Sequence, residues 1–127
     1  MMDYRQINPL LLAYVGDAVF DLYVRAKLVK TMQLPVQELH KKATHYVRAA
    51  GQDAALQRLQ SQLTETEAEI VRRGRNTKSR VPKNTGPAAY RRATGFEALL
   101  GWLYLTGQKA RLEELLAQLA IGEEDEK

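Results

Sequence analysis

The chain has 127 residues, enough for one domain with a sizeable hydrophobic core, so we expect residues 1–127 to form a single domain. It contains no cysteine, which excludes disulfides, thiolate metal sites and a cysteine nucleophile and fits a reducing cytoplasm. The formal net charge is +4, and no apolar run approaches the length of a membrane span. The charge is unevenly distributed, because residues 72–92 carry arginines and lysines but no acid.

The first predicted helix begins at Asn8 and Pro9 and extends to about Lys30. Asparagine can accept a backbone N–H as the N-cap, and proline in the first turn gives up only a donor that has no partner. Apolar residues surround nearly the whole circumference, which predicts a central, buried helix. Asp17 is out of place in such a helix, because a buried carboxylate must be paired, hydrogen-bonded, protonated or bound to a cation.

The neighbours of Asp17 help to interpret it. Asp21 and Arg25 are one turn apart and predict an ordinary ion pair. Gly16 costs about 1 kcal/mol in a helix interior relative to alanine, which indicates close approach of a backbone or a ligand at this turn. We therefore interpret Asp17 as a site residue, with a structural ion pair as the alternative.

The next segment is predicted to contain two helices. After a turn at residues 31–34, Pro35 starts a helix that extends to Ala50, where Gly51 ends or kinks it, and residues 54–63 form a further short helix. The spacing of the two histidines in this segment disfavours a histidine metal site and favours a solvated basic face. That face consists of His40, Lys41, Lys42, His45 and Arg48.

A capped helix and a long basic loop follow. Thr64 and Glu67 have the spacing of a capping box, which predicts a helix that ends near Arg73. Residues 74–87 form a polar stretch with two glycines and two prolines, and such a long loop in a compact domain is usually functional or disordered. Its basic and amide side chains favour contact with a nucleic-acid backbone over a solvated linker. It has no aromatic residue to stack a base, which indicates recognition of backbone and shape.

The second apolar helix is predicted over residues 88–106. Apolar residues again nearly encircle it, and a single carboxylate, Glu97, again interrupts them. Gly101 is one turn from Glu97, as expected where another helix packs closely. A last amphipathic helix from Lys109 to about Ile121 is a packing helix, and the acidic residues after it form a solvated end.

Each of the two apolar helices therefore carries one acid. Packed together, they would bring Asp17 and Glu97 into one wall that opens on the basic loop. Carboxylate oxygens are hard ligands suited to Mg²⁺ or Mn²⁺, and Mg²⁺ usually takes only one or two protein carboxylates. Such an ion can polarise a phosphoryl oxygen and lower the pKa of a bound water. The combination of a cation and a basic loop suggests phosphodiester hydrolysis.

Several segments resemble known ribonuclease sequences in their order and spacing. Residues 12–19, LAYVGDAV, are similar to the signature helix of the ribonuclease III catalytic domain, and residues 96–105, FEALLGWLYL, are similar to its second acidic helix. With HKK at 40–42, RRGRN at 72–76 and PKNT at 82–85, they make the chain resemble the Mini-III ribonucleases along essentially its whole length. These enzymes lack the double-stranded-RNA-binding domain that usually follows.

The resemblance implies an all-α, ribonuclease III-type helical endonuclease domain that forms a homodimer in the cytoplasm, away from any membrane. It would use Mg²⁺ to cut double-stranded RNA, and in Mini-III enzymes the substrate is the precursor of large-subunit (23S) ribosomal RNA. The resemblance is also compatible with a ribosomal protein on that RNA as a further partner. Asp17 matches the metal-binding aspartate of the family and Glu97 its metal-binding glutamate. Two further acids of the general pattern are replaced by Ala13 and Thr94. Waters would complete the metal shell, and the number of metals per site stays open.

We therefore predict that Asp17 and Glu97 hold Mg²⁺, or Mn²⁺ in its place, and that basic and amide side chains bind the RNA backbone. One alternative is a non-catalytic RNA-binding or ribosome-assembly module. Another is a structural helical protein in which both acids form buried ion pairs. The predicted RNA-binding residues are Arg72, Arg73, Arg75, Asn76, Lys78, Arg80, Lys83 and Asn84, with Lys41 and Lys42 as weaker candidates.

Overall fold

The computed structural model describes residue 3, residues 6–77 and residues 86–123, and the secondary structure in this part of the chain is entirely helical. The predicted all-α class is confirmed. None of the helices described is long and apolar enough to cross a membrane. The helices are α1 (Pro9–Thr31), α2 (Val36–Val47), α3 (Ala49–Leu59), the short 3₁₀ helix η2 (Gln60–Gln62), α4 (Glu65–Asn76), α5 (Pro87–Leu105) and α6 (Lys109–Ala117).

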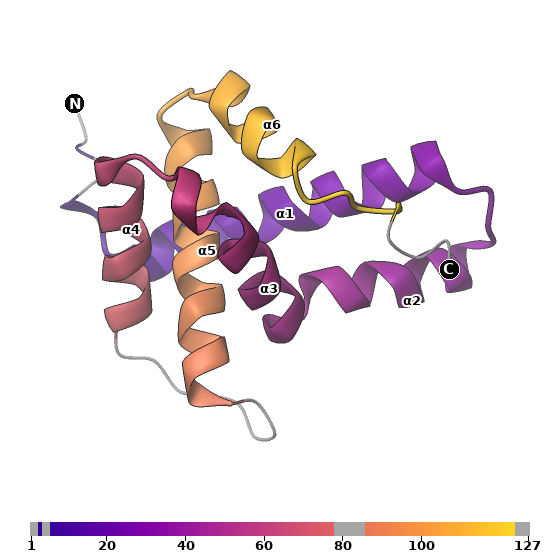
Figure 1. The fold of residues 1–127 in the computed structure, drawn as a ribbon, viewed down its shortest axis with the longest axis horizontal. Helices are drawn as coiled ribbons and strands as arrows, with labels where there is room; N and C mark the ends of the chain where they lie inside the picture. The colour runs from indigo at the N-terminus through magenta and orange to yellow at the C-terminus, as the bar shows by residue number, and fades with distance from the viewer. Residues whose placement is uncertain (1–2, 4–5, 78–85, 124–127) are drawn as a thin grey trace.

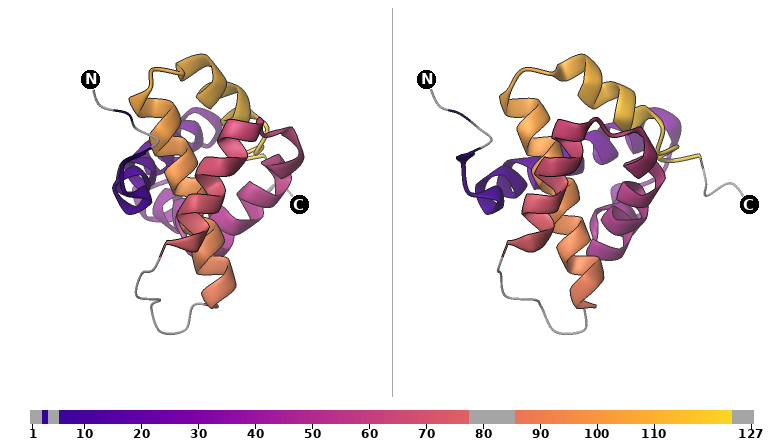
Figure 2. Two further views of the ribbon diagram at one scale, coloured as in Figure 1. Left: turned by 90° about the vertical axis from the view of Figure 1, so that its left-hand side faces the viewer. Right: turned by 60° about the vertical axis from the view of Figure 1, so that its left-hand side comes forward.

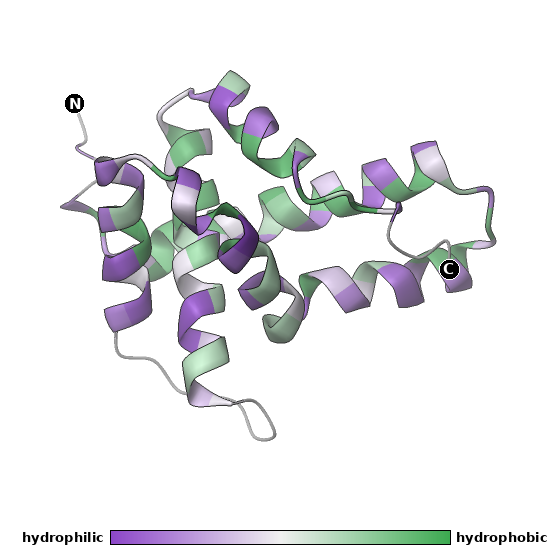
Figure 3. Cartoon of the chain, viewed as in Figure 1, coloured by the Kyte–Doolittle hydropathy of each residue, from purple (hydrophilic) through white to green (hydrophobic). Residues whose placement is uncertain are grey.

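Helix α5 is the centre of the fold. It packs against α1, α3, α4 and α6, and it crosses α1 with α4 running alongside it (Figure 1). The two further views in Figure 2 show the same neighbourhood of α4 and α5. Figure 3 shows hydrophobic residues along α5 and hydrophilic bands on α4. In the core, the rings of Phe96 and Phe20 meet edge to face with centroids 5.0 Å apart, a contact worth about 1 kcal/mol beyond its buried area.

Helices α1 and α5 cross backbone to backbone. A Cβ atom at Gly16 would lie 1.7 Å from the carbonyl oxygen of Glu97, and a Cβ atom at Gly101 would lie 1.9 Å from the carbonyl oxygen of Leu12. Only glycine lets two helix backbones approach this closely. The close approach predicted at both glycines is confirmed. Because Asp17 follows Gly16, the crossing also brings Asp17 beside Glu97.

Two predicted caps are confirmed, and one of them also joins two helices. The side chain of Asn8 accepts a hydrogen bond from the amide of Leu10 at 2.9 Å. Thr64 and Glu67 form the reciprocal capping box, with hydrogen bonds of 2.9 and 3.1 Å. The buried Glu67 carboxylate also accepts two hydrogen bonds from Arg111, at 2.8 and 2.9 Å, which lower its pKa. Glu67 thereby links α4 to α6.

Some predicted helix boundaries are wrong. The chain breaks at Arg48, whose backbone is extended, and Gly51 lies in the first turn of α3 instead of ending α2. A Cβ atom at Gly51 would lie 2.3 Å from the carbonyl oxygen of His45, so this glycine lets α3 begin against the end of α2. Helix α6 ends at Ala117, short of Ile121.

The loop predicted over residues 74–87 is shorter at both ends. Helix α4 continues through Asn76, so Gly74 and Arg75 are helical. Pro87 is the first residue of α5, where its missing N–H has no helical partner to lose. Residues 78–85 lie outside the described part of the chain.

Helix α1 is buried on one side only, contrary to the prediction. Its inner face reaches the core, but its outer face carries large exposed apolar side chains, and Asp17 is itself exposed. An apolar pattern predicts that a helix face is covered by another surface, but it does not show whether that surface belongs to the same chain or to another one. Because Asp17 is exposed, burial does not force its carboxylate to find a partner, contrary to the expectation. The exposed apolar residues of α1 are Leu11 (60%), Tyr14 (80%), Leu22 (70%) and Val29 (64%).

Candidate active site

A cleft of about 390 Å³ opens where α1, α3 and α5 meet. Asp17 of α1 and Glu97 of α5 both line it, and their carboxyl groups are within hydrogen-bonding range of each other. The structure therefore brings together the two acids that interrupt the apolar helices. The other lining residues are Leu10, Ala13, Tyr14, Val47, Ala49, Gln52, Tyr90, Ala93 and Thr94.

Of the two acids, Glu97 has a strongly shifted pKa. Burial raises the pKa of Glu97 to about 8, and the hydrogen bond with Asp17 acts in the same direction, whereas the hydrogen bond from Gln52 opposes it. Within the described part of the chain, no lysine, arginine or histidine forms an ion pair with either acid. Among these residues, neither acid takes part in the buried ion pair that the structural alternative requires.

The donor set of the cleft fits Mg²⁺. Two converging carboxylates that have no cationic partner among the described residues match the one or two that Mg²⁺ takes from proteins. The described residues contain no group of three or more His, Cys, Asp or Glu side chains that could hold a metal, so water and substrate would supply the other ligands. Ala13 and Thr94, at the two positions where the resemblance would place further acids, line the same cleft. The Thr94 hydroxyl donates to the carbonyl oxygen of Tyr90 at 3.0 Å.

Two of the predicted RNA-binding residues lie in a second hollow. Arg75 and Asn76, at the end of α4, line a depression of about 520 Å³ together with Arg91 and Arg92 of α5. Arg92 is engaged by Asp53, whose carboxylate accepts two of its hydrogen bonds. Arg91 belongs to the basic run recognised in the sequence, but nothing in the pattern singled it out from its neighbours.

The remaining predicted RNA-binding residues lie elsewhere. Arg72 is exposed on α4 and pairs with Glu69. On α2, the ammonium of Lys41 is 3.5 Å from the carboxylate of Glu38, and Lys42 is half-buried. Neither lysine lines the cleft or the arginine hollow. The other four, Lys78, Arg80, Lys83 and Asn84, lie outside the described residues.

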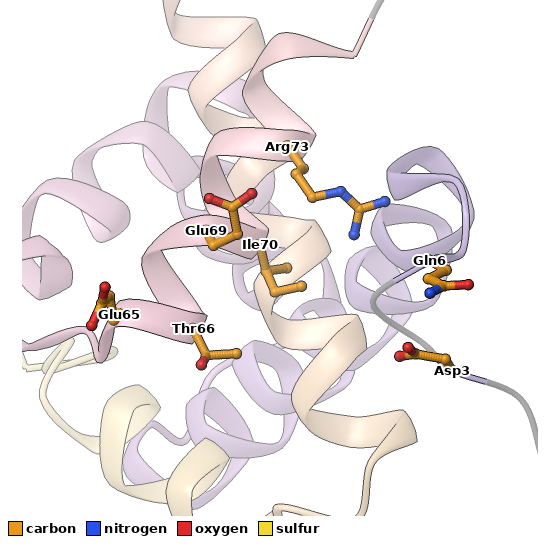
Figure 4. Close-up of a pocket in the computed structure, with 7 residues that line it drawn as sticks. All are labelled: Asp3, Gln6, Glu65, Thr66, Glu69, Ile70 and Arg73. Carbon is orange, nitrogen blue, oxygen red and sulfur yellow. The ribbon is translucent and has the colours of Figure 1, made fainter.

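Arg73 has a structural contact. Its guanidinium donates to the carbonyl oxygen of Ile7 at 3.1 Å. It also lines a separate pocket of about 490 Å³ and extends toward the N-terminal segment that carries Gln6 (Figure 4). Arg73 therefore fastens the lead-in segment to α4.

Sequence reasoning missed Gln52. This residue of α3 is 2% exposed and donates hydrogen bonds of 3.0 Å to Oε2 of Glu97 and to the carbonyl oxygen of Val47. The signal that could have identified it is a pair of polar residues, Gln52 and Asp53, on the inner side of a short helix, because buried polar groups need partners.

Glu97 should make the metal-free protein less stable as the pH rises. Its pKa is about 8 in the folded chain against an ordinary value of 4.5, so between these values the folded chain holds a proton that the unfolded chain releases. The stabilisation by this proton is complete below about pH 4.5, falls through the window and is lost above about pH 8. The pKa values of Asp53 and Glu67 are lowered, so both titrate below this window.

We therefore expect the melting temperature in EDTA to be higher near pH ~5.5 than near pH ~8.5, as measured by differential scanning calorimetry. Glu97→Gln removes the titrating group and should reduce this difference. The same difference in both proteins would show that another group causes the pH dependence.

Comparison with known proteins identifies the family. Residues 10–108 match the Ribonuclease III domain. A Mini-ribonuclease 3 from Enterococcus faecalis is 48% identical over 132 aligned positions, covering 100% of both chains, and one from Thermoanaerobacter is 50% identical over 111, covering 87% of this chain and 78% of that protein. The crystal structure of protein FN1578 from Fusobacterium nucleatum has the same fold, with a TM-score of 0.86 at 24% identity over 94% of this chain and 98% of that one. The chain therefore belongs to the ribonuclease III family, as a ribonuclease of the Mini-ribonuclease 3 group.

Proposed function

We propose that this ribonuclease hydrolyses double-stranded RNA with Mg²⁺, or Mn²⁺ in its place, held by Asp17 and Glu97. The observation that supports the proposal is the meeting of two carboxylates in one cleft with no cationic side chain beside them in the described part of the chain. When bound, such an ion polarises a phosphoryl oxygen and makes water a stronger nucleophile at neutral pH. The contribution of the chain is to hold both carboxylates at a rigid helix crossing.

The arginine hollow is suited to an RNA backbone. Arg75 and Arg91 are exposed, and neither forms an ion pair within the described residues. Guanidinium groups bind phosphate with two parallel hydrogen bonds, and the N-terminal end of α5 nearby favours an anion. Tyr90 and Thr94 of the same helix line the cleft, so one half of α5 serves both surfaces.

Removing both exposed arginines should weaken RNA binding. We expect Arg75→Ala with Arg91→Ala to reduce affinity for duplex RNA and to make the dependence of log Kd on log salt shallower by about 1 to 2, because each lost phosphate contact removes roughly 0.7 to 0.9. Fluorescence anisotropy in EDTA at several salt concentrations measures both. Lys27→Ala with Lys30→Ala removes the same charge from a part of α1 that lines neither the cleft, the arginine hollow nor the apolar groove, and an equal effect of this pair would show that only net charge matters.

We also infer that the chain forms a homodimer through the outer face of α1. This face, defined by Leu11, Tyr14, Leu22 and Val29, continues into an apolar groove of about 630 Å³ that Leu22 shares with Tyr104. Monomeric proteins seldom expose contiguous apolar surface of this kind. Two-fold pairing would cover one such face with another and would give the dimer two clefts, one for each RNA strand.

Leu22→Glu should dissociate the dimer. A carboxylate on each copy of a two-fold interface would face its own equivalent or an apolar surface, and both arrangements are unfavourable. Sedimentation velocity should show a dimer for the wild type and a monomer for Leu22→Glu. Val36→Glu is the matched control, because Val36 is 80% exposed but lies on α2. A dimer that persists in Leu22→Glu would contradict this interface.

A cleavage assay tests the proposed function. Labelled double-stranded and single-stranded RNA are incubated with the protein in EDTA, in Mg²⁺ and in Mn²⁺. Cleavage of a precursor of 23S ribosomal RNA is measured in the presence and in the absence of ribosomal protein. We expect duplex cleavage only with a divalent ion and preference for the precursor, the cytoplasmic substrate proposed for this enzyme. Full activity in EDTA, or equal cleavage of single strands, would contradict the proposal, and binding without cleavage would favour a non-catalytic module.

A further inference from the structure

The side-chain amide of Gln52 has a fixed orientation. Its Nε2 donates to two acceptors, the carbonyl oxygen of Val47 and Oε2 of Glu97, each at 3.0 Å. Because a carbonyl oxygen and a carboxylate oxygen are both acceptors, only the NH₂ group of the amide can bond them, and only one orientation of the amide satisfies the two contacts. Val47 is the last residue of α2, where carbonyl groups lack helical partners. Gln52 therefore connects the end of α2 to Glu97 in the cleft.

The next residue, Asp53, makes a different connection. Its buried carboxylate accepts hydrogen bonds from Arg92 at 2.6 and 2.9 Å and from Gln57 at 3.3 Å. This bidentate pair fastens α3 to α5 outside the cleft. Two consecutive residues of α3 thus bind α5, but only Gln52 contacts a carboxylate that faces Asp17.

We propose that Gln52 is a positioning residue, which holds the Glu97 carboxylate in the orientation that receives a divalent cation together with Asp17. By donating to Oε2, it leaves Oε1 of Glu97 without this partner. A neutral amide orients the carboxylate without cancelling its charge, whereas an arginine at this position would compete with the cation. Groups that orient metal ligands in this way typically change metal affinity by about 10- to 100-fold when removed. The inference rests on the proposed metal-dependent function.

The test compares two neighbouring substitutions. Gln52→Met keeps the length of the side chain but removes both donors, and Asp53→Asn weakens the tie between α3 and α5 without touching Glu97. Electron paramagnetic resonance of free Mn²⁺ gives the metal affinity without any cleavage, and the Mg²⁺ concentration at half-maximal cleavage gives it during turnover. We expect Gln52→Met to weaken both by about tenfold or more. Asp53→Asn should lower the melting temperature and leave both metal values near those of the wild type.

A second measurement needs no substitution. The side-chain NH₂ resonances of Gln52 in ¹⁵N-labelled wild-type protein should shift during a Mg²⁺ titration. The midpoint of this shift should equal the Mg²⁺ affinity obtained when Mg²⁺ displaces bound Mn²⁺. Resonances that stay fixed while Mg²⁺ binds would overturn the proposal, as would an unchanged Mn²⁺ affinity in folded Gln52→Met. If the wild type binds no divalent ion, the proposed function fails first and the role of Gln52 fails with it.

Discussion

Asp17→Asn is expected to lower the rate of duplex RNA cleavage by at least about 100-fold, with fold and RNA affinity nearly unchanged. Asparagine has the shape of aspartate but is a poor ligand for a hard cation. The side chain at this position is exposed, so the substitution opens no cavity. Single-turnover cleavage at saturating protein isolates the chemical step, and the melting temperature and anisotropy titrations in EDTA measure fold and binding.

The same substitution has an electrostatic signature. Asp17 helps to raise the pKa of Glu97, so removing its charge lowers that pKa and reduces the pH dependence of stability in EDTA. Asp21→Asn is the matched control, since Asp21 lies one turn further along α1 and pairs with Arg25 at 3.0 Å. Cleavage by Asp17→Asn at the wild-type rate would remove Asp17 from the mechanism.

The sequence predicted the parts of the fold that depend on local chemistry. The caps at Asn8 and Thr64 and the pair of Asp21 with Arg25 involve residues within one turn, and each is confirmed. The resemblance to the Mini-III ribonucleases and the all-α class are also confirmed. Gly16 and Gly101 were informative because glycine in an apolar helix is unfavourable unless a neighbouring backbone occupies the space of its side chain.

The sequence did not predict features that depend on which surface meets which. The outer face of α1 also carries large apolar side chains, so Tyr14 and Leu22 could not be distinguished from core residues. The hydrogen bond from Gln52 to Glu97 joins residues far apart in the chain, and periodicity contains no information about such pairs. Arg73 belongs to a basic run, and only the fold shows its contact with Ile7.

The helix crossing itself provides the second large effect, because Gly16→Ala is expected to destabilise the protein by about 3 kcal/mol or more. Alanine is the better helix former by about 1 kcal/mol, but its Cβ would lie 1.7 Å from the carbonyl oxygen of Glu97, and backbone cannot move aside as a flexible side chain can. Relief requires α1 and α5 to separate, which also moves Asp17 away from Glu97. Cleavage should therefore fall even in molecules that remain folded.

Differential scanning calorimetry and cleavage assays at low temperature measure the two consequences separately. The melting temperature of Gly16→Ala should fall by roughly 10 °C, because 1 kcal/mol corresponds to about 3 to 5 °C for a domain of this size. Gly86→Ala is the control, since φ is −62° and a Cβ atom there meets nothing within 4 Å. Because Gly86 is the N-cap of α5, where glycine is preferred to alanine, this cost opposes the entropic gain of the substitution, and the net change should be less than about 1 kcal/mol. A Gly16→Ala protein as stable as Gly86→Ala would mean that the two helices do not cross in backbone contact, and the geometry that pairs Asp17 with Glu97 would be wrong.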